Sequence, residues 1–153
     1  MTHRTLMLGA ASLALLGTAA GAFYFWGVRA EGRLLQPDDP AVVAVGAEVY
    51  SEHCASCHGA NLEGEPNWQR RKPDGKLPAP PHDQTGHTWH HDEATLFDIT
   101  KFGTAKAANL EGYVSDMPIY DDLLTDAEII AVLSFIKSTW PEAIRERHDQ
   151  LGK

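Results

Sequence analysis

The sequence predicts an all-α domain, because helix signals recur along it and strand signals do not. Apolar residues spaced by three and four positions mark several stretches as amphipathic helices. No stretch shows the sustained alternation of apolar and polar residues that marks a half-buried strand. An uncharged segment near the N-terminus, Thr5 to Val28, stands apart from this domain.

The uncharged N-terminal segment is predicted to be a transmembrane helix. As a helix it would be about 36 Å long, enough to cross a hydrocarbon core of about 30 Å. Arg4 precedes it and an aromatic cluster, Phe23 to Trp26, closes it, as in a helix that starts in the cytoplasm. The alternative is a cleaved signal peptide with a small-residue site at Ala20 to Ala22. We expect residues 1–28 to form a retained anchor and the rest of the chain to be extracytoplasmic.

The remainder of the chain divides into three parts. Residues 29–40 contain "LLQPDDP" and are predicted to be an extended, polar linker. Residues 41–141 form one domain, and residues 142–153 form a polar tail that either adds a helix or frays.

The whole chain has a formal net charge of −8, which disfavours contact with nucleic acid and with anionic lipid headgroups.

The first helix of the domain is predicted over residues 41–54, with Pro40 at its start and a stripe of valines along one side. Prolines then prevent regular structure over residues 59–91. An irregular stretch of that length inside a small domain needs a reason.

Two further helices follow the irregular stretch. Asp92 is expected to cap a helix from Glu93 to about Phe102 that ends at Gly103. The last helix begins at the capping box "TDAE", residues 125–128, and continues through an apolar run.

Both cysteines of the chain lie in "CASCHG", residues 54 to 59. If this stretch is helical, Cys54, Cys57 and His58 share one face. Two thiols one turn apart can add to the two vinyl groups of a haem, while the neighbouring imidazole reaches the iron. C-x-x-C-H is the attachment pattern of c-type haem, so the motif predicts one covalently attached haem c.

Three other interpretations of the two cysteines fit the sequence less well. A thioredoxin-like redox pair needs βαβ units, for which the sequence gives no strand pattern. A zinc site needs four ligands and would have to recruit histidines at irregular spacing. A structural disulfide between residues so close in sequence gains little from loop closure.

Met117 is the candidate for the second axial ligand of the iron. Met1 is the initiator and Met7 lies in the predicted anchor, so Met117 is the methionine left in the domain. Pro118 follows it and favours a loop. Four histidines are rival ligands: His82, His87, His90 and His91. A His/Met pair raises the reduction potential, which favours electron transfer.

With these motifs the domain resembles the class I c-type cytochromes, and more narrowly the membrane-anchored mono-haem cytochromes c of bacteria. Three stretches carry the resemblance: "VGAEVYSEHCASCHGANLEG", "TGHTWHHDEATLFDITKFG" and "MPIYDDLLTDAEIIAVLSFIKSTWP". The resemblance implies a one-electron carrier, not an enzyme, tethered to the inner membrane with its haem domain in the periplasm. It also implies redox partners in a respiratory chain, such as a quinol-oxidising complex or a terminal oxidase.

The resemblance also implies how the first and last helices pack. In that family they cross at right angles, with a glycine and an aromatic residue of the first helix against the last. Gly46 and Tyr50 match this pair, and Val132 and Phe135 match the receiving face.

Further site residues are implied only by the resemblance. The carbonyl of Pro80 or Pro81 would orient the proximal imidazole, and the two prolines remain alternatives. Trp89 would donate its indole N–H to a haem propionate, assisted by the charge of Arg70 or Arg71. The insertion "EPNWQRRKPDGKLPAPPHDQ" departs from the compact members of the family and leaves that side of the haem undefined.

Two alternative functions belong to different classes. A haem-based enzyme or gas sensor would lack a firm Met117 bond and would bind peroxide, NO or CO. A copper-handling module would use the histidine cluster from His82 to His91, since imidazole binds copper and zinc. We expect instead that these histidines serve the helix start or the loop. Four acidic residues flank Met117 and are expected to select a basic partner: Glu111, Asp116, Asp121 and Asp122.

Overall fold

The computed structural model describes residues 32–152 of the 153-residue chain. The predicted transmembrane helix over residues 1–28 lies outside the described residues. Within residues 32–152, no helix has the length and apolar character needed to cross a membrane. From Arg33 onward the chain forms one compact unit.

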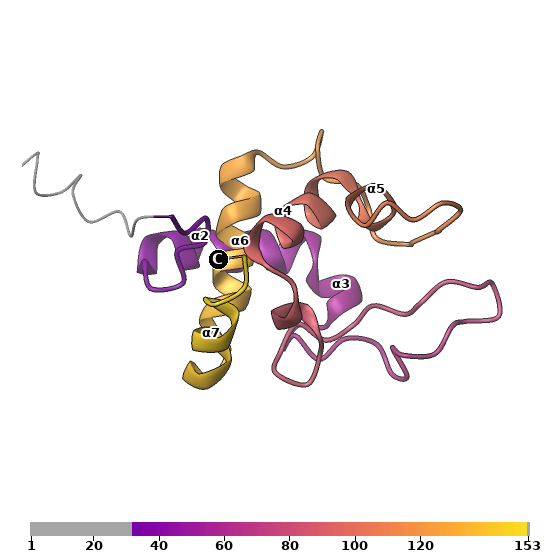
Figure 1. The fold of residues 1–153 in the computed structure, drawn as a ribbon, viewed down its shortest axis with the longest axis horizontal. Coiled ribbons are helices and arrows are strands. Elements are labelled where there is room, and N and C mark those ends of the chain that lie inside the picture. The colour runs from indigo at the N-terminus through magenta and orange to yellow at the C-terminus, as the bar shows by residue number, and fades with distance from the viewer. Residues whose placement is uncertain (1–31, 153) are drawn as a thin grey trace, which may run out of the picture. The chain divides into compact units, whose positions relative to one another are not determined.

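The described part of the chain, residues 32–152, is helical and contains no strand, which confirms the all-α prediction. Its elements in chain order are α2 (Pro40–His53), α3 (Ala55–His58), the 3-10 helix η1 (Thr88–His90), α4 (Glu93–Phe102), α5 (Thr104–Ala107), α6 (Asp126–Ser138) and α7 (Glu142–His148). Two long loops, between α3 and η1 and between α5 and α6, extend toward the same side of the body (Figure 1).

Side-chain caps are found at the starts of α2, α4 and α6. The Asp39 carboxylate accepts hydrogen bonds from the first backbone amides of α2, and Asp92 accepts from Thr95 N at 2.9 Å at the start of α4. Thr125 and Glu128 form both hydrogen bonds of the capping box that starts α6. Each of these side chains satisfies backbone amides that the first helical turn leaves without a partner.

Helices α2 and α6 cross in close contact, and Gly46 lies at the crossing (Figure 1). A Cβ atom built on Gly46 would lie 2.0 Å from the Ala131 carbonyl oxygen and 2.8 Å from Cβ of Phe135. One turn further along α2, the Tyr50 ring packs on Phe135 with centroids 5.5 Å apart. The expected packing of Gly46 and Tyr50 on the last helix is confirmed, with Phe135 on the receiving face. Val132 lies in the same buried core and also lines a cavity.

Part of the predicted linker packs onto the domain. The Leu35 side chain is 2% exposed, and the backbone amides of Leu34 and Leu35 donate to Glu93 Oε2 at 2.7 and 3.1 Å. Gln36 N donates to Ser134 Oγ at 2.9 Å. Residues 34–36 are therefore part of the folded body, because burial and hydrogen bonds to α4 and α6 hold them there.

The predicted polar tail forms α7, and a buried charge cluster joins it to α4 and α6. Lys137 is fully buried, with Nζ 2.7 Å from Glu93 Oε1 and 2.6 Å from Asp149 Oδ1. Arg33 Nη2 lies 2.9 Å from the other oxygen of Asp149. One potential metal-ligand atom from each of Glu93, His148 and Asp149 lies within 4.8 Å of the other two, the spacing of a possible metal site. The Lys137 ammonium already supplies the positive charge that these two carboxylates require.

Replacing Gly46 with alanine is expected to destabilise the fold by about 1 to 3 kcal/mol, the usual cost of overpacking a core. Alanine has the higher helix propensity, by about 1 kcal/mol, so a net loss would come from the contact with the α6 backbone. Urea unfolding of the haem-loaded protein measures the difference. Ala44→Ser, at an exposed position of the same helix, is the control and should change the free energy of unfolding by less than about 0.5 kcal/mol. Equal stability of Gly46→Ala and the wild type would contradict the close crossing.

His148 is expected to make the protein sensitive to mild acid. It is 1% exposed, and neither ring nitrogen has a hydrogen-bond partner within residues 32–152. Burial lowers the pKa of His148, and the neighbouring positive charge of Lys137 adds to this effect. The unfolded chain therefore takes up a proton near pH 6.5 while the folded chain does not, so stability is lost as the pH falls below about 6.5.

The variant His148→Phe should remove this contribution, since phenylalanine can occupy the buried place beside Trp140 without a titratable group. Urea unfolding between pH 7 and pH 5 should show a shallower loss of stability in this variant than in the wild type. The control Val45→Phe adds an aromatic ring at an exposed position without changing a titratable group, and should retain the wild-type slope. A His148→Phe slope equal to that of the wild type would exclude this role.

Candidate functional site

One cavity of about 620 Å³ brings together the motif residues and both long loops. Its wall on the helical side is apolar and comes from α4 and α6, including Leu96, Val132, Leu133 and Ile136. Its other walls come from the CASCHG turn, the insertion and the loop that carries Met117. The cavity therefore explains why the chain keeps long irregular segments, because they surround a space instead of packing against each other.

The CASCHG stretch forms the predicted helical turn at the cavity wall. Helix α2 ends at His53, and α3 follows after Cys54. The amides of Cys57 and His58 donate to the Cys54 carbonyl at 3.2 and 2.9 Å, so the stretch keeps one continuous turn. Both cysteines are free thiols, and Cys54, Cys57 and His58 all line the cavity.

His58 is buried, and the backbone of the following loop fixes its orientation. Its Nδ1 lies 2.8 Å from the Pro80 carbonyl oxygen, which can only accept, so Nδ1 carries the proton. Burial lowers the pKa of His58, and the Pro80 carbonyl partly opposes this shift. The ring is therefore neutral, with Nε2 left as a lone-pair donor, which is the form in which histidine binds a metal. Of the two proline alternatives, Pro80 makes the contact, whereas the Pro81 carbonyl accepts from Thr88 Oγ1 at 3.4 Å.

The thiol of Cys54 is poorly suited to disulfide exchange. Burial, with a smaller effect of Cys57, raises the pKa of Cys54 to about 11. The thiolate is the nucleophile in thiol–disulfide exchange, so a thiol that stays protonated at neutral pH reacts slowly. This environment disfavours the thioredoxin-like interpretation of the two cysteines.

Met117 lines the same cavity as the motif and is partly buried against the core. Its amide donates to Ser115 Oγ at 3.1 Å within the loop. Three residues later the Tyr120 hydroxyl donates to the His53 carbonyl at 2.8 Å, which ties the loop to the end of α2. The structure thus brings Met117 and His58, which are far apart in sequence, to one cavity. Their roles as axial ligands stay predictions.

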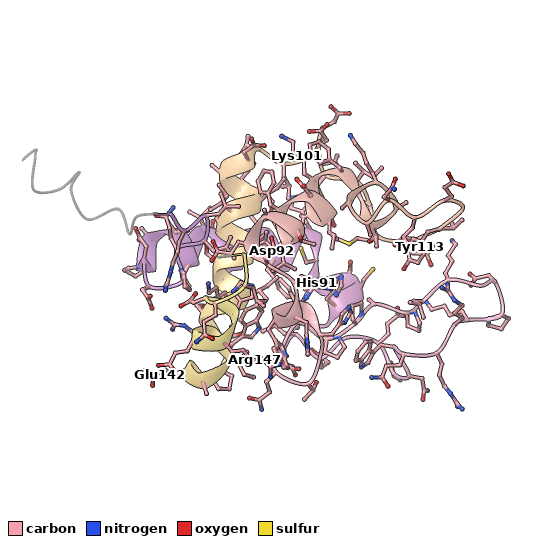
Figure 2. All side chains as sticks on the ribbon, viewed as in Figure 1. His91, Asp92, Lys101, Tyr113, Glu142 and Arg147 are labelled. Atoms are coloured by element: carbon pink, nitrogen blue, oxygen red, sulfur yellow. The ribbon has the colours of Figure 1, made fainter. Side chains whose placement is uncertain are left out.

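The four histidines of the predicted cluster have different neighbours. His82 stacks on the His58 ring with centroids 3.9 Å apart, and its Nδ1 lies 2.9 Å from Thr88 Oγ1. Burial lowers the pKa of His82 well below its usual value. His87 stacks on Trp68 with centroids 5.2 Å apart, and His90 contacts Trp89. His91 ends η1 ahead of α4, near Asp92 (Figure 2). Whether these histidines bind a metal stays a prediction.

The three residues predicted at the haem propionates lie outside the cavity wall. Trp89 is partly buried, and its indole N–H has no hydrogen-bond partner among the described residues. Arg147 lies over its ring at 5.2 Å. Arg70 is exposed, and Arg71 donates to the Gly75 carbonyl at 2.7 Å. The propionate roles of Trp89, Arg70 and Arg71 stay predictions.

The insertion supplies cavity residues that the sequence analysis did not identify. Trp68, Lys72 and Leu77 line the cavity, and Glu65 closes the base of the insertion by accepting from Ala79 N at 2.6 Å. The sequence did contain a signal for Trp68, because it is a single tryptophan in a charged and proline-rich stretch. The partners of its ring come from a segment distant in sequence, so spacing could not reveal them.

Two of the four acidic residues expected to attract a basic partner are paired within the protein. Asp116 forms an ion pair with Lys76. Asp121 lies 3.5 Å from Nζ of Lys101, which also contacts Asp126 at 2.6 Å (Figure 2). These lysines reduce the negative field around Met117.

The donor set fits a haem c, and the fold around it defines a class of protein. Two free thiols and an oriented neutral imidazole lie on one turn, and Met117, whose side chain carries a thioether, lines the same cavity. These are the ligand types that hold a covalent haem with a His/Met iron. An all-α domain with this arrangement is a c-type cytochrome.

Comparison with known proteins gives the family. The Cytochrome c family model matches residues 43–140. The chain belongs to the cytochrome c family, whose members carry covalently attached haem c and transfer electrons. No solved structure matches the chain significantly.

The chain is also similar to a nitrite reductase of Stutzerimonas stutzeri. The two are 33% identical over 98 residues, which is 60% of this chain and 15% of that protein. The chain thus spans a small part of the length of this relative.

Proposed function

We propose that this protein is a one-electron carrier that is tethered to the periplasmic face of the inner membrane and serves membrane-bound redox partners. The observation that carries the proposal is the convergence of an oriented His58 and Met117 on the cavity that holds both motif thiols. The two thiols, Cys54 and Cys57, would hold the haem covalently. His58 and Met117 would be the axial ligands.

The residues of the chain would keep the haem pocket rigid and dry. A bound haem supplies an iron centre that gains or loses one electron without bond-making chemistry on a substrate. The Pro80 carbonyl holds the His58 ring in one tautomer, and His82 packs against its face. The apolar side chains of α4 and α6 exclude water. A fixed ligand set and a dry pocket reduce the rearrangement that accompanies each change of charge.

A carrier explains this site better than an enzyme does. With Met117 as a ligand, the iron has no open position for peroxide, nitrite or a gas. The similarity to part of a nitrite reductase concerns a region much smaller than that protein. Because it covers 15% of that protein, it supplies no specific argument for nitrite chemistry in this chain.

The ligand assignment predicts the visible spectrum of the protein made with a haem-attachment system. Haem should stay attached in acid denaturant, and the ferric protein should show the weak far-red band of a methionine–iron bond. Met117→Ala should abolish that band and lower the reduction potential, because the thioether favours ferrous iron. Met7→Leu is the matched control and should leave the spectrum unchanged. A high-spin or bis-histidine wild-type spectrum would instead support the ligand-binding alternative.

The tether rests on the uncharged segment before Arg29 and predicts a rate effect. A membrane anchor confines the protein to the surface on which a membrane-bound partner lies and so raises its local concentration there. In bacterial membranes supplied with quinol, the full chain should be reduced on the order of tenfold faster than an equal amount of a variant secreted without residues 1–28. Equal rates, or a mature N-terminus at Phe23 in the full chain, would argue against the tether.

A further inference from the structure

The loop that carries Met117 has few connections of its own to the body. From Glu111 to Asp116, no backbone amide or carbonyl forms a hydrogen bond with another backbone group of the described chain. Most of this segment is exposed, and the Val114 side chain is 60% exposed. A loop with so few contacts opens readily, since local opening depends on the contacts that must be broken. The Tyr120–His53 hydrogen bond anchors the part of the loop after Met117. The part before Met117 needs another contact to hold it in place.

The insertion has a defined shape that can provide this constraint. At its base, Glu65 N donates to the Ala79 carbonyl at 2.8 Å, and the Glu65 carboxylate accepts from Ala79 N. At its tip, Lys72 N donates to the Lys76 carbonyl at 2.8 Å, and Lys76 N donates to Asp74 Oδ1 at 3.0 Å. The backbone of Lys76 is therefore held on both sides, and its side chain extends from a fixed point.

Two side-chain contacts join the insertion to the Met117 loop. The Lys76 ammonium forms an ion pair and hydrogen bond with the carboxylate of Asp116, the residue directly before Met117. The Arg71 guanidinium lies 5.9 Å from the centre of the Tyr113 ring, on the side of the loop that faces the insertion (Figure 2). Lys76 is also followed by Leu77, which lines the haem cavity as Met117 does.

We propose that Lys76 is a positioning residue that holds the Met117 loop closed over the cavity through its ion pair with Asp116. The proposal rests on the proposed function, because it requires Met117 to be an iron ligand. The ion pair breaks when the loop opens, so it lowers the population of the open form. An added ligand can reach the iron only in that open form, and its apparent affinity therefore reports the opening equilibrium.

The test is imidazole binding to the ferric, haem-loaded full chain at pH 8. Loss of the far-red methionine–iron band measures how much imidazole has bound. Lys76→Gln should raise the apparent imidazole affinity about 1.5- to 5-fold, the range expected when a solvent-exposed ion pair is lost. Lys106→Gln is the matched control. It removes a lysine of α5 whose ammonium lies 4.1 Å from the centre of the Phe102 ring, and should leave the affinity unchanged.

Two further measurements separate an ion pair from a general structural effect. The charge-swapped double variant Lys76→Asp/Asp116→Lys should restore the wild-type affinity, whereas each single reversal should raise it. The imidazole affinity of the wild type should also increase as the ionic strength is raised from about 0.01 M to about 1 M. The Debye length falls from about 30 Å to about 3 Å over this range, so salt screens the ion pair and the loop opens more often. Lys76→Gln should lack most of this dependence.

The outcomes distinguish this proposal from the function on which it rests. A wild-type spectrum without the methionine–iron band would overturn both. A wild-type protein with the band, but with a Lys76→Gln variant that binds imidazole with unchanged affinity, would overturn the positioning role alone. Failure of the charge swap to restore the affinity would have the same consequence.

Discussion

The close crossing of α2 and α6 at Gly46 is the constraint on which the rest of the domain depends. A backbone approach that leaves no room for a Cβ fixes both the separation and the register of the two helices. That register places the end of α2, with its Cys-X-X-Cys-His turn, against the face of α6 that carries Val132 and Ile136. Without this approach the two thiols and His58 would not face an apolar wall, and the cavity would have no fixed dimensions.

Around this rigid pair, the site is completed by irregular backbone. The insertion brings the Pro80 carbonyl to His58, and a second loop brings Met117 to the same cavity. Loops suit this task because they present backbone carbonyls and side chains inward at positions that no regular helix could reach. They also have fewer contacts, so their closure depends on specific interactions such as the Tyr120–His53 hydrogen bond and the Lys76–Asp116 ion pair.

The opposite side of the domain is stabilised in a different way. Lys137 is buried between two carboxylates, one from α4 and one from the residue that follows α7. A buried charge of this kind is costly unless it is fully paired, so the three groups fix one another in place. Through Glu93 the cluster also binds the backbone of Leu34 and Leu35. The segment that leads into the domain is thereby held against its body.

The helix caps and the Cys-X-X-Cys-His turn could be predicted from the sequence alone. Its caps at Asp92 and Thr125 act locally, and the spacing of Cys54, Cys57 and His58 on one turn is a property of a helix, so neither needs the rest of the fold. The tertiary structure decided what depends on segments distant in sequence: which proline carbonyl meets His58, how the insertion closes the cavity, and where Lys137 finds its partners. Such contacts are set by packing and loop closure, which local patterns do not encode. Spacing alone therefore could not distinguish Pro80 from Pro81.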